Sequence, residues 1–492
     1  MSTVRRIAAN AAVSSIAQFA NYVLAFFYML YAARYLGTAS FGLLSFALAF
    51  AAIFGLIADL GLRTLTVREV ARDRSLAHKF TANVLVMKLG LAVIGYGLMA
   101  LIVNLMPHSE ETLVVVYIIG LSVVLSAFTQ VFYSVFQAFE KMEYVSLGLV
   151  LNGALMLIGV VVAMQLGLGL IGFALLFLLA RAVELVYGMV AYRLKFQNGA
   201  TRQPGGLGLD LAFWKQSLKE AWPMGAMAIG ILIYFRIDTV MLSFMKDDVA
   251  VGLYSAAYRL SELSAVIPGM FVAAIFPVMS QYYRAAGNSF AMAYEKSSRY
   301  LFMLALPIAL AVTLLASPIV NLVYGSQYAD SASALQVLIW AAAIMYVTMV
   351  MGTTFVAANK QMVNLKIVIV AAALNIVLNV FLIPRYSYVG ASAATVATEA
   401  FGLLCGVFFL RRAGYGVSIK NVYLLPLLAL CAAIAISAVL LIIGVNAFVA
   451  APVGVVVYAV IVFTTMIRDD DRQLMRKVLG LRKLKVWKRG DP

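Results

Sequence analysis

The sequence predicts an all-α protein that crosses a membrane about fourteen times. Hydrophobic residues make up 64% of the 492 residues, charged residues make up only 12%, and the mean hydropathy is +0.98. Apolar stretches of about 20 residues, the length of helix that spans a bilayer core, follow one another along the whole chain. Lys and Arg gather in every second connection between these stretches. Composition and charge pattern together exclude a soluble protein.

Polar or charged residues bound each apolar stretch and place the predicted spans to within a few residues. The spans are 10–35, 41–62, 80–105, 112–136, 145–166, 169–192, 217–242, 249–276, 294–316, 331–355, 362–383, 389–410, 422–443 and 447–467. The first span lacks a small-residue cleavage site, so we expect it to remain as a helix. Cys405 and Cys431 lie within spans, and we expect them to act as small apolar residues and not as a disulfide or a metal pair.

The distribution of positive charge predicts the orientation. Thirty of the 37 Lys and Arg residues fall on one side of the membrane, and the opposite connections hold only Arg34, Lys246 and Arg385. By the positive-inside rule, both termini are predicted to be cytoplasmic, in a multi-pass protein of the cell membrane. The net charge of +16 is therefore expected to face anionic lipid and not nucleic acid.

Two halves of the chain repeat weakly. Residues 41–45 align with 251–255, 138–141 with 357–360, and 171–174 with 389–392. Each match pairs spans that are six apart, so the halves share one orientation and are predicted to be related by a pseudo-twofold axis along the membrane normal. We predict an N-terminal lobe at 1–200, a second lobe at 201–415, two added spans at 416–467 and a basic amphipathic tail at 468–492.

Short motifs along the chain carry a family resemblance. They are Ala33-Arg34-Tyr35-Leu36-Gly37, Phe41-Gly42-Leu43, Asp59-Leu60-Gly61, Arg68-Glu69, Ile237-Asp238-Thr239-Val240-Met241-Leu242 and Val251-Gly252-Leu253-Tyr254. Together with the fourteen-span length, they resemble the Wzx-type polysaccharide-biosynthesis flippases of the multidrug/oligosaccharidyl-lipid/polysaccharide exporter superfamily. The resemblance implies two six-helix lobes that move a polyprenyl-(di)phosphate-linked oligosaccharide from the cytoplasmic to the outer leaflet by alternating access. The expected partners are this anionic lipid, membrane lipids and other polysaccharide-assembly proteins, with no cofactor.

When the cations assigned to the two membrane faces are set aside, four cations remain within the membrane and five carboxylates share their depth range. Each must face protein or water because a buried charge costs at least about 2.5–3.5 kcal/mol. The cations are Lys88, Arg181, Arg236 and Arg259, and the carboxylates are Asp59, Glu184, Asp238, Glu262 and Glu399. Spacing of i, i+3 places Arg181 with Glu184, and Arg259 with Glu262, on one helix face each. Arg236 and Asp238 are two residues apart and point to different faces.

The cations are the predicted substrate ligands. Arg236 and Arg259 lie at similar depths, and with Lys88 they are expected to line a cavity between the lobes. Guanidinium groups suit a diphosphate because they bind it bidentately. Arg181 is a weaker candidate, and Tyr234 and Tyr258 beside the arginines are expected to stack on sugar faces. The alternative for every cation is an ion pair that fixes helix positions.

The carboxylates are predicted to couple transport to an ion or to form structural pairs. Asp59 lies at the end of its span, where a helix-end hydrogen bond is an equal alternative. Glu399 has no cationic neighbour in sequence, which makes it a candidate for proton or cation coupling. Asp238, Glu262 and Glu184 each have an arginine nearby in sequence. Asn375 and Asn379, at helical spacing, are expected to hold helices together.

Other functions give weaker fits. A membrane glycosyltransferase or polymerase needs catalytic acidic or His-rich loops, whereas no predicted outer loop exceeds about ten residues. No P-loop is present, and we expect no enzymatic activity and no metal site. A multidrug/cation antiporter of the same superfamily would favour an acidic cavity. A lipid II flippase shares the fourteen-span plan and an arginine-lined cavity.

Overall fold

The computed structural model describes residues 3–106, 109–196, 209–285 and 289–466, with side chains from Ile16 onward. Within these ranges the chain is helical and contains no β-strand. The predicted interlobe linker around Gln203 and the predicted amphipathic tail with Leu474, Val478, Leu481 and Leu484 lie outside the described residues. The all-α fold class is confirmed for the part of the chain that is described.

Twelve of the described helices are long and apolar enough to cross a membrane. Two of them contain a break that separates two candidate passes, so the described residues contain fourteen candidate passes. Helix α1 (Thr3–Asp59) breaks at Gly37, where φ is 77°, and α13 (Gln361–Arg412) breaks at Ser387, where φ is 51°. As single helices these 57- and 52-residue elements would reach about 80 Å, far beyond a bilayer core of about 30 Å.

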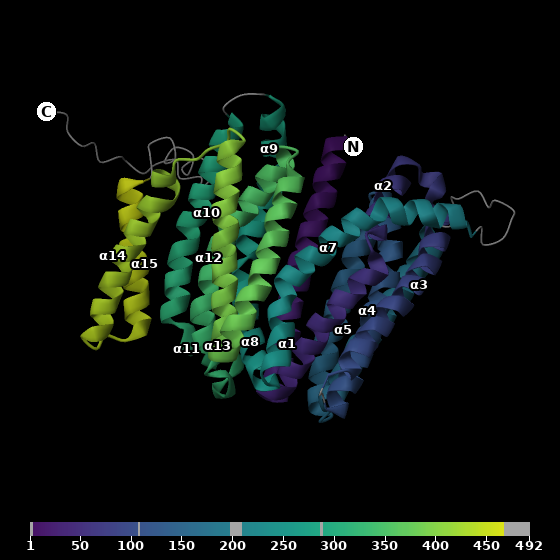
Figure 1. Cartoon of the computed structure of the whole chain (residues 1–492), viewed down its shortest axis with the longest axis horizontal. Helices are drawn as coiled ribbons and strands as arrows, with labels where there is room; N and C mark the ends of the chain where they lie inside the picture. Colours follow the sequence, from purple (N-terminus) through teal and green to yellow (C-terminus); the bar gives the residue numbers. More distant parts are fainter. Residues whose placement is uncertain (1–2, 107–108, 197–208, 286–288, 467–492) are drawn as a thin grey trace.

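The first lobe holds six passes. Its elements are α1, α2 (Leu62–Arg72), η1 (Arg74–Leu76), α3 (Ala77–Asn104), α4 (Glu110–Ala138), α5 (Met142–Gln165) and α6 (Leu170–Lys195). Figure 1 shows α3, α4 and α5 side by side, with α2 lying across their ends on the side where α1 begins. We call this side of the molecule the N-terminal side and the other the opposite side.

The second lobe repeats this plan, and two further helices lie outside it. Its elements are α7 (Leu211–Met245), α8 (Asp248–Ser264), α9 (Val266–Arg284), α10 (Ser289–Leu314), α11 (Ala316–Tyr324), η3 (Ser326–Tyr328), α12 (Ser331–Ala357) and α13. After η4 (Lys420–Leu424), α14 (Leu425–Ile442) and α15 (Ala447–Thr465) form a hairpin at one edge of the molecule (Figure 1). The eighth pass, predicted as one helix, breaks at Ala265, three residues before Pro268.

The strongest repeat in the sequence forms the contact between the lobes. Gly42 of α1 packs on the backbone of Asp248, and Gly252 of α8 packs on the backbone of Thr38. A Cβ atom at either glycine would overlap the facing carbonyl oxygen. Thr38 lies four residues before Gly42 on α1, and Asp248 lies four residues before Gly252 on α8. Each helix therefore presents the same pair of positions to the other, and the contact is reciprocal. Such reciprocity is expected at a pseudo-twofold axis, and small residues allow the two backbones to approach closely.

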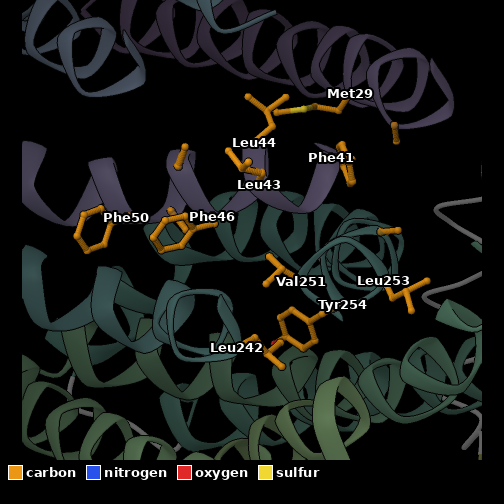
Figure 2. Close-up of a cluster of buried hydrophobic side chains, with 14 of the residues drawn as sticks. Met29, Phe41, Leu43, Leu44, Phe46, Phe50, Leu242, Val251, Leu253 and Tyr254 are labelled. Carbon is orange, nitrogen blue, oxygen red and sulfur yellow. The ribbon is translucent and has the colours of Figure 1, made fainter. Parts of the chain in front are cut away.

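One hydrophobic core crosses the lobe boundary around this glycine pair. In Figure 2, the segment of α1 that carries Phe41, Phe46 and Phe50 lies beside the segment of α8 that carries Val251 and Tyr254. Leu242 of α7 and Leu43 and Leu44 of α1 belong to the same buried cluster. The alternation of large aromatic and small residues along α1 fills the space beside the glycine contact. The two lobes are therefore packed together in this structure.

On the N-terminal side, the start of α7 lies on the first lobe. Arg68 of α2 pairs with Glu220 of α7 at 2.5 Å, and Lys79 of α3 pairs with Asp210 at 3.1 Å. The backbone N–H of Phe213, followed by Lys79, holds the pKa of Asp210 below its ordinary value, so Asp210 is charged at neutral pH. Although α7 follows the predicted domain boundary at residue 200, its first turns pack with the core of the first lobe.

On the opposite side, Arg34 joins the lobes. Its guanidinium donates to the carbonyl oxygens of Leu322 and Val323 in the last turn of α11. Gln327 donates in return to the carbonyl oxygen of Arg34 at 3.0 Å, and Tyr328 donates to that of Ala33 at 2.9 Å. A cation at a helix C-terminus is favoured because free carbonyl groups gather there. The lobes are thus joined on both sides.

Candidate functional site

Lys88 forms a buried ion pair inside the first lobe. Its Nζ atom lies 2.6 Å from Oδ1 of Asp59 and donates to the carbonyl oxygen of Ala127 at 3.0 Å. The Lys88 residue is 0% exposed, whereas the Asp59 side chain is 24% exposed. This geometry fits the structural alternative for both residues, because all access to the ammonium group is filled by protein.

Arg181 and Glu184 form the ion pair that their i, i+3 spacing indicated. Nη1 of Arg181 lies 2.6 Å from Oε2 of Glu184. The hydroxyl of Tyr133 donates to the other oxygen of Glu184 at 3.0 Å, and Glu184 is buried. A third of the Arg181 side chain stays exposed. Glu184 is therefore fully engaged inside the lobe, while the arginine keeps an accessible edge.

Arg236, and not Arg259, is the cation that faces Glu262. Nη2 of Arg236 lies 4.0 Å from Oε1 of Glu262, and its guanidinium lies 5.9 Å from the centroid of the Tyr258 ring. Arg259 and Glu262 are three residues apart on α8, but the Arg259 guanidinium lies over Phe41 of the other lobe and Glu262 is near Arg236 of α7. Both members of the observed pair are more than a third exposed, so the pair is loosely held.

Arg259 has no carboxylate partner among the described residues. Its guanidinium lies 5.9 Å from the centroid of the Phe41 ring, which belongs to the other lobe. Its Nε atom is buried without a hydrogen-bond partner. Arg259 and Arg181 both interact electrostatically with the hydroxyl of Tyr28, so cations from the two lobes approach the same part of α1. Within the described part of the chain, Arg259 is thus the cation of the predicted set without a carboxylate partner.

Asp238 is a buried carboxylate held by neutral donors. It is 4% exposed and points away from Arg236, as the spacing predicted. Asn379 donates to its Oδ1 atom at 2.5 Å, and the hydroxyls of Tyr254 and Thr395 donate to its Oδ2 atom at 2.8 Å each. Asn379 also donates to Asn375 at 2.9 Å. Three helices, α7, α8 and α13, therefore meet at one carboxylate without a cation.

Glu399 is a second buried carboxylate that pairs with no cation of the described residues. It lies on α13 and accepts a hydrogen bond from the hydroxyl of Tyr234 at 2.7 Å and one from Thr348 at 3.2 Å. Tyr234 and Tyr258, the predicted sugar-stacking residues, thus contact Glu399 and Arg236 respectively. Within the described ranges, no group of three or more His, Cys, Asp and Glu residues is arranged to hold a metal ion.

Sequence reasoning missed the neutral partners of these charges. Tyr254, Thr395 and Thr348 are ordinary hydroxyl residues of apolar helices, and nothing in the sequence indicated a carboxylate neighbour for them. The signal at Asn375 and Asn379 was visible, because two amides at i, i+4 spacing in a membrane helix must face protein. Phe41 beneath Arg259 carried no polar signal, since a phenylalanine in a membrane span is ordinary.

Comparisons with known proteins agree with this architecture. The chain is similar to the probable low-salt glycan biosynthesis flippase Agl15 of Haloferax volcanii, with 23% identity over 197 residues, 40% of this chain and 41% of that protein. It is also similar to the probable flippase AglR of the same organism, with 27% identity over 185 residues, 37% of this chain and 38% of that protein. The chain thus spans about two-fifths of the length of the curated relatives it matches.

Fold and family comparisons cover more of the chain. The structure of lipid II flippase MurJ in an inward closed conformation has a TM-score of 0.72 and 16% identity, covering 95% of this chain and 100% of that one, which shows a shared fold. The MatE family matches residues 223–381. The polysaccharide biosynthesis protein family matches residues 7–283, more than half of the chain. This protein therefore belongs to the polysaccharide biosynthesis protein family.

Proposed function

We propose that this protein is a flippase that moves a polyprenyl-(di)phosphate-linked oligosaccharide from the cytoplasmic to the outer leaflet by alternating access. The observation that carries the proposal is Arg259, a membrane-embedded guanidinium that has no carboxylate partner among the described residues and rests on Phe41 of the other lobe. An unpaired charge at this depth is costly unless it meets a ligand. Family membership and the flippases among the relatives support the same function.

Phosphate is the chemical group that fits this site. A guanidinium binds a phosphate through two parallel hydrogen bonds, and the low dielectric strengthens the contact. Arg181 and Arg236 each keep an exposed part of the side chain, and Arg181 and Arg259 both interact electrostatically with Tyr28. The proposed ligand set is therefore Arg259 first, with Arg181 and Arg236 as flanking cations. Lys88 is left out, because it is buried in its pair with Asp59.

Alternating access requires the two interlobe joints to open in turn. We propose that the N-terminal side is cytoplasmic, so that Arg68, Glu220, Lys79 and Asp210 separate to admit the lipid head group. The contacts of Arg34 with α11 then break to release it outward. Pro223 inside α7 removes a backbone hydrogen bond beside the first joint and gives that helix a place to bend.

The orientation has a direct test. Single cysteines at Ser75 and Lys246, placed on a background without Cys405 and Cys431, report the N-terminal and the opposite side. We expect an impermeant maleimide to label only position 246 from outside intact cells. Outside labelling at position 75 would reverse the proposed direction of transport.

The proposed substrate is tested by the lipids that a deletion strain accumulates. A flippase changes no covalent bond, so fully assembled lipid-linked oligosaccharide should accumulate on the cytoplasmic leaflet while surface polysaccharide falls. Incomplete units would indicate a glycosyltransferase, and exported single units that are not polymerised would indicate a polymerase. Accumulated lipid II would place the protein with that alternative, and unchanged lipids with greater sensitivity to cationic drugs would indicate the multidrug branch.

A further inference from the structure

Two carboxylates of the second lobe, Asp238 and Glu399, have no cationic partner among the residues that the structure describes. They differ in the hydrogen bonds that stabilise the ionised form. Asp238 accepts three hydrogen bonds of 2.8 Å or less. Glu399 accepts only two, and the one from Thr348 is long at 3.2 Å. Because hydrogen bonds to the ionised form are what keep a buried carboxylate charged, Glu399 is the one that more readily takes up a proton.

Tyr234 connects Glu399 to the proposed phosphate site. Its hydroxyl donates to Oε1 of Glu399 at 2.7 Å. Tyr234 lies two residues before Arg236 on α7, and Tyr258, whose ring lies beneath Arg236, also interacts electrostatically with Glu399. A change at the Glu399 carboxyl therefore acts on the turn of α7 that carries Arg236 and on the turn of α8 that carries Tyr258.

The surroundings of Glu399 contain few other charges. Tyr234 of α7 donates a hydrogen bond to Glu399, and Tyr258 of α8 interacts electrostatically with it. The other charged groups that interact with these two tyrosines are Asp238 and Arg236 of α7 and Glu262 of α8. Helix α12 supplies Thr348 and has no charged residue in its sequence. The only cation of this set, Arg236, faces Glu262 and not Glu399. Nothing in the set therefore replaces a proton as the neutralising charge of Glu399.

We propose that Glu399 is a proton-binding site. Binding of the proton changes the position of Tyr234, and this change alters the affinity with which Arg236 binds an anionic head group. When Glu399 is ionised, it accepts a hydrogen bond from the Tyr234 hydroxyl and so fixes the position of that hydroxyl. A proton from the solvent that binds at Oε1 removes the charge and makes this oxygen a poorer acceptor, so the hydrogen bond from Tyr234 weakens and that hydroxyl turns away. Release of the proton to water restores the bond. The effect on the head group rests on the proposed function, whereas proton binding does not.

Infrared titration tests proton binding without any substrate. The purified full-length protein in phosphatidylcholine nanodiscs should show a carboxylic C=O stretch that appears as the pH falls, and Glu399→Gln should remove it. Thr398→Val is the matched control, because Thr398 is buried on the same helix and its hydroxyl bonds only the Ala394 carbonyl oxygen. This control should keep the band. Glu399→Asp should keep a shifted band, which covers the case in which the Gln variant does not fold.

Assignment to Glu399 has clear contrary outcomes. A band that survives Glu399→Gln and disappears in Asp238→Asn would assign the proton to Asp238 and overturn the proposal. Absence of any protonated carboxyl band down to the lowest pH at which the protein stays folded would overturn it as well.

Binding of polyprenyl diphosphate to the protein in the same nanodiscs tests whether protonation of Glu399 changes the affinity for an anionic head group. We expect its affinity to change about tenfold across the pH range of the band, a usual size for coupling between two sites. Glu399→Gln and Tyr234→Phe should abolish this pH dependence. If the lipid binds through Arg259 but the dependence survives both changes, the link is wrong and the flippase proposal stands. If the band behaves as expected and no polyprenyl diphosphate binds at any pH, the flippase proposal fails instead.

Discussion

Replacing Lys88 by Met distinguishes a structural ion pair from a substrate ligand. The change removes the 2.6 Å ion pair and leaves the Asp59 carboxylate inside the first lobe without a cationic partner. Loss of one partner of a buried pair costs about 3–5 kcal/mol. Since a quarter of the Asp59 side chain reaches the surface, we expect a loss somewhat below this range, about 2–3 kcal/mol in the free energy of unfolding.

The assay is reversible unfolding in mixed micelles, with the folded fraction read by circular dichroism. The double variant Lys88→Met/Asp59→Leu removes both charges and should recover stability to within about 1 kcal/mol of the original protein. Lys366→Met, at an exposed position, is the control for loss of a lysine. An unchanged stability of Lys88→Met together with lost binding of polyprenyl diphosphate would refute this reasoning and make Lys88 a ligand.

Three further variants test the packing of the lobes. Asp238→Asn should destabilise the protein by about 1–3 kcal/mol, because one amide hydrogen then faces the donors Tyr254 and Thr395, and equal thermal stability would contradict the network. Gly42→Ala should lower the melting temperature, and Gly90→Ala should leave it unchanged. A Cβ atom at residue 42 would overlap the backbone of α8, whereas one at residue 90 has no atom within contact distance. Arg68→Glu should lengthen the distance between spin labels at Ser75 and Lys219, and Arg68→Glu/Glu220→Arg should restore it. An unchanged distance would show that the pair does not hold the joint.

Hydrophobicity and charge were enough to predict the architecture. The break at Gly37 lies between the predicted first and second spans, and the break at Ser387 lies between the predicted eleventh and twelfth. The repeat around Gly42 and Gly252 predicted two similar halves, and the structure shows that these two segments touch each other. Patterns of this kind are local, so they survive in a single sequence.

The pairing of charges could not be predicted in the same way. The i, i+3 spacing of Arg181 and Glu184 sufficed because both partners lie on one helix. The same spacing does not pair Arg259 with Glu262, since the Arg259 guanidinium lies over Phe41 of the other lobe. Lys88 and Asp59, 29 residues apart, meet only because α1 and α3 pack together. Tertiary packing decides which residues neighbour each other on different helices, and a helical period carries no information about it.

The most direct test of the central claim is the affinity of the Arg259 variant for an anionic lipid. Polyprenyl diphosphate binding to the purified protein in phosphatidylcholine nanodiscs is compared for the original protein, Arg259→Gln and Arg385→Gln, the last an exposed arginine elsewhere on the second lobe. We predict at least a tenfold loss for Arg259→Gln, about 1.4 kcal/mol or more, because a charge-assisted contact to phosphate is removed. Arg385→Gln should bind as the original protein does. Equal affinity of Arg259→Gln and the original protein would contradict the account.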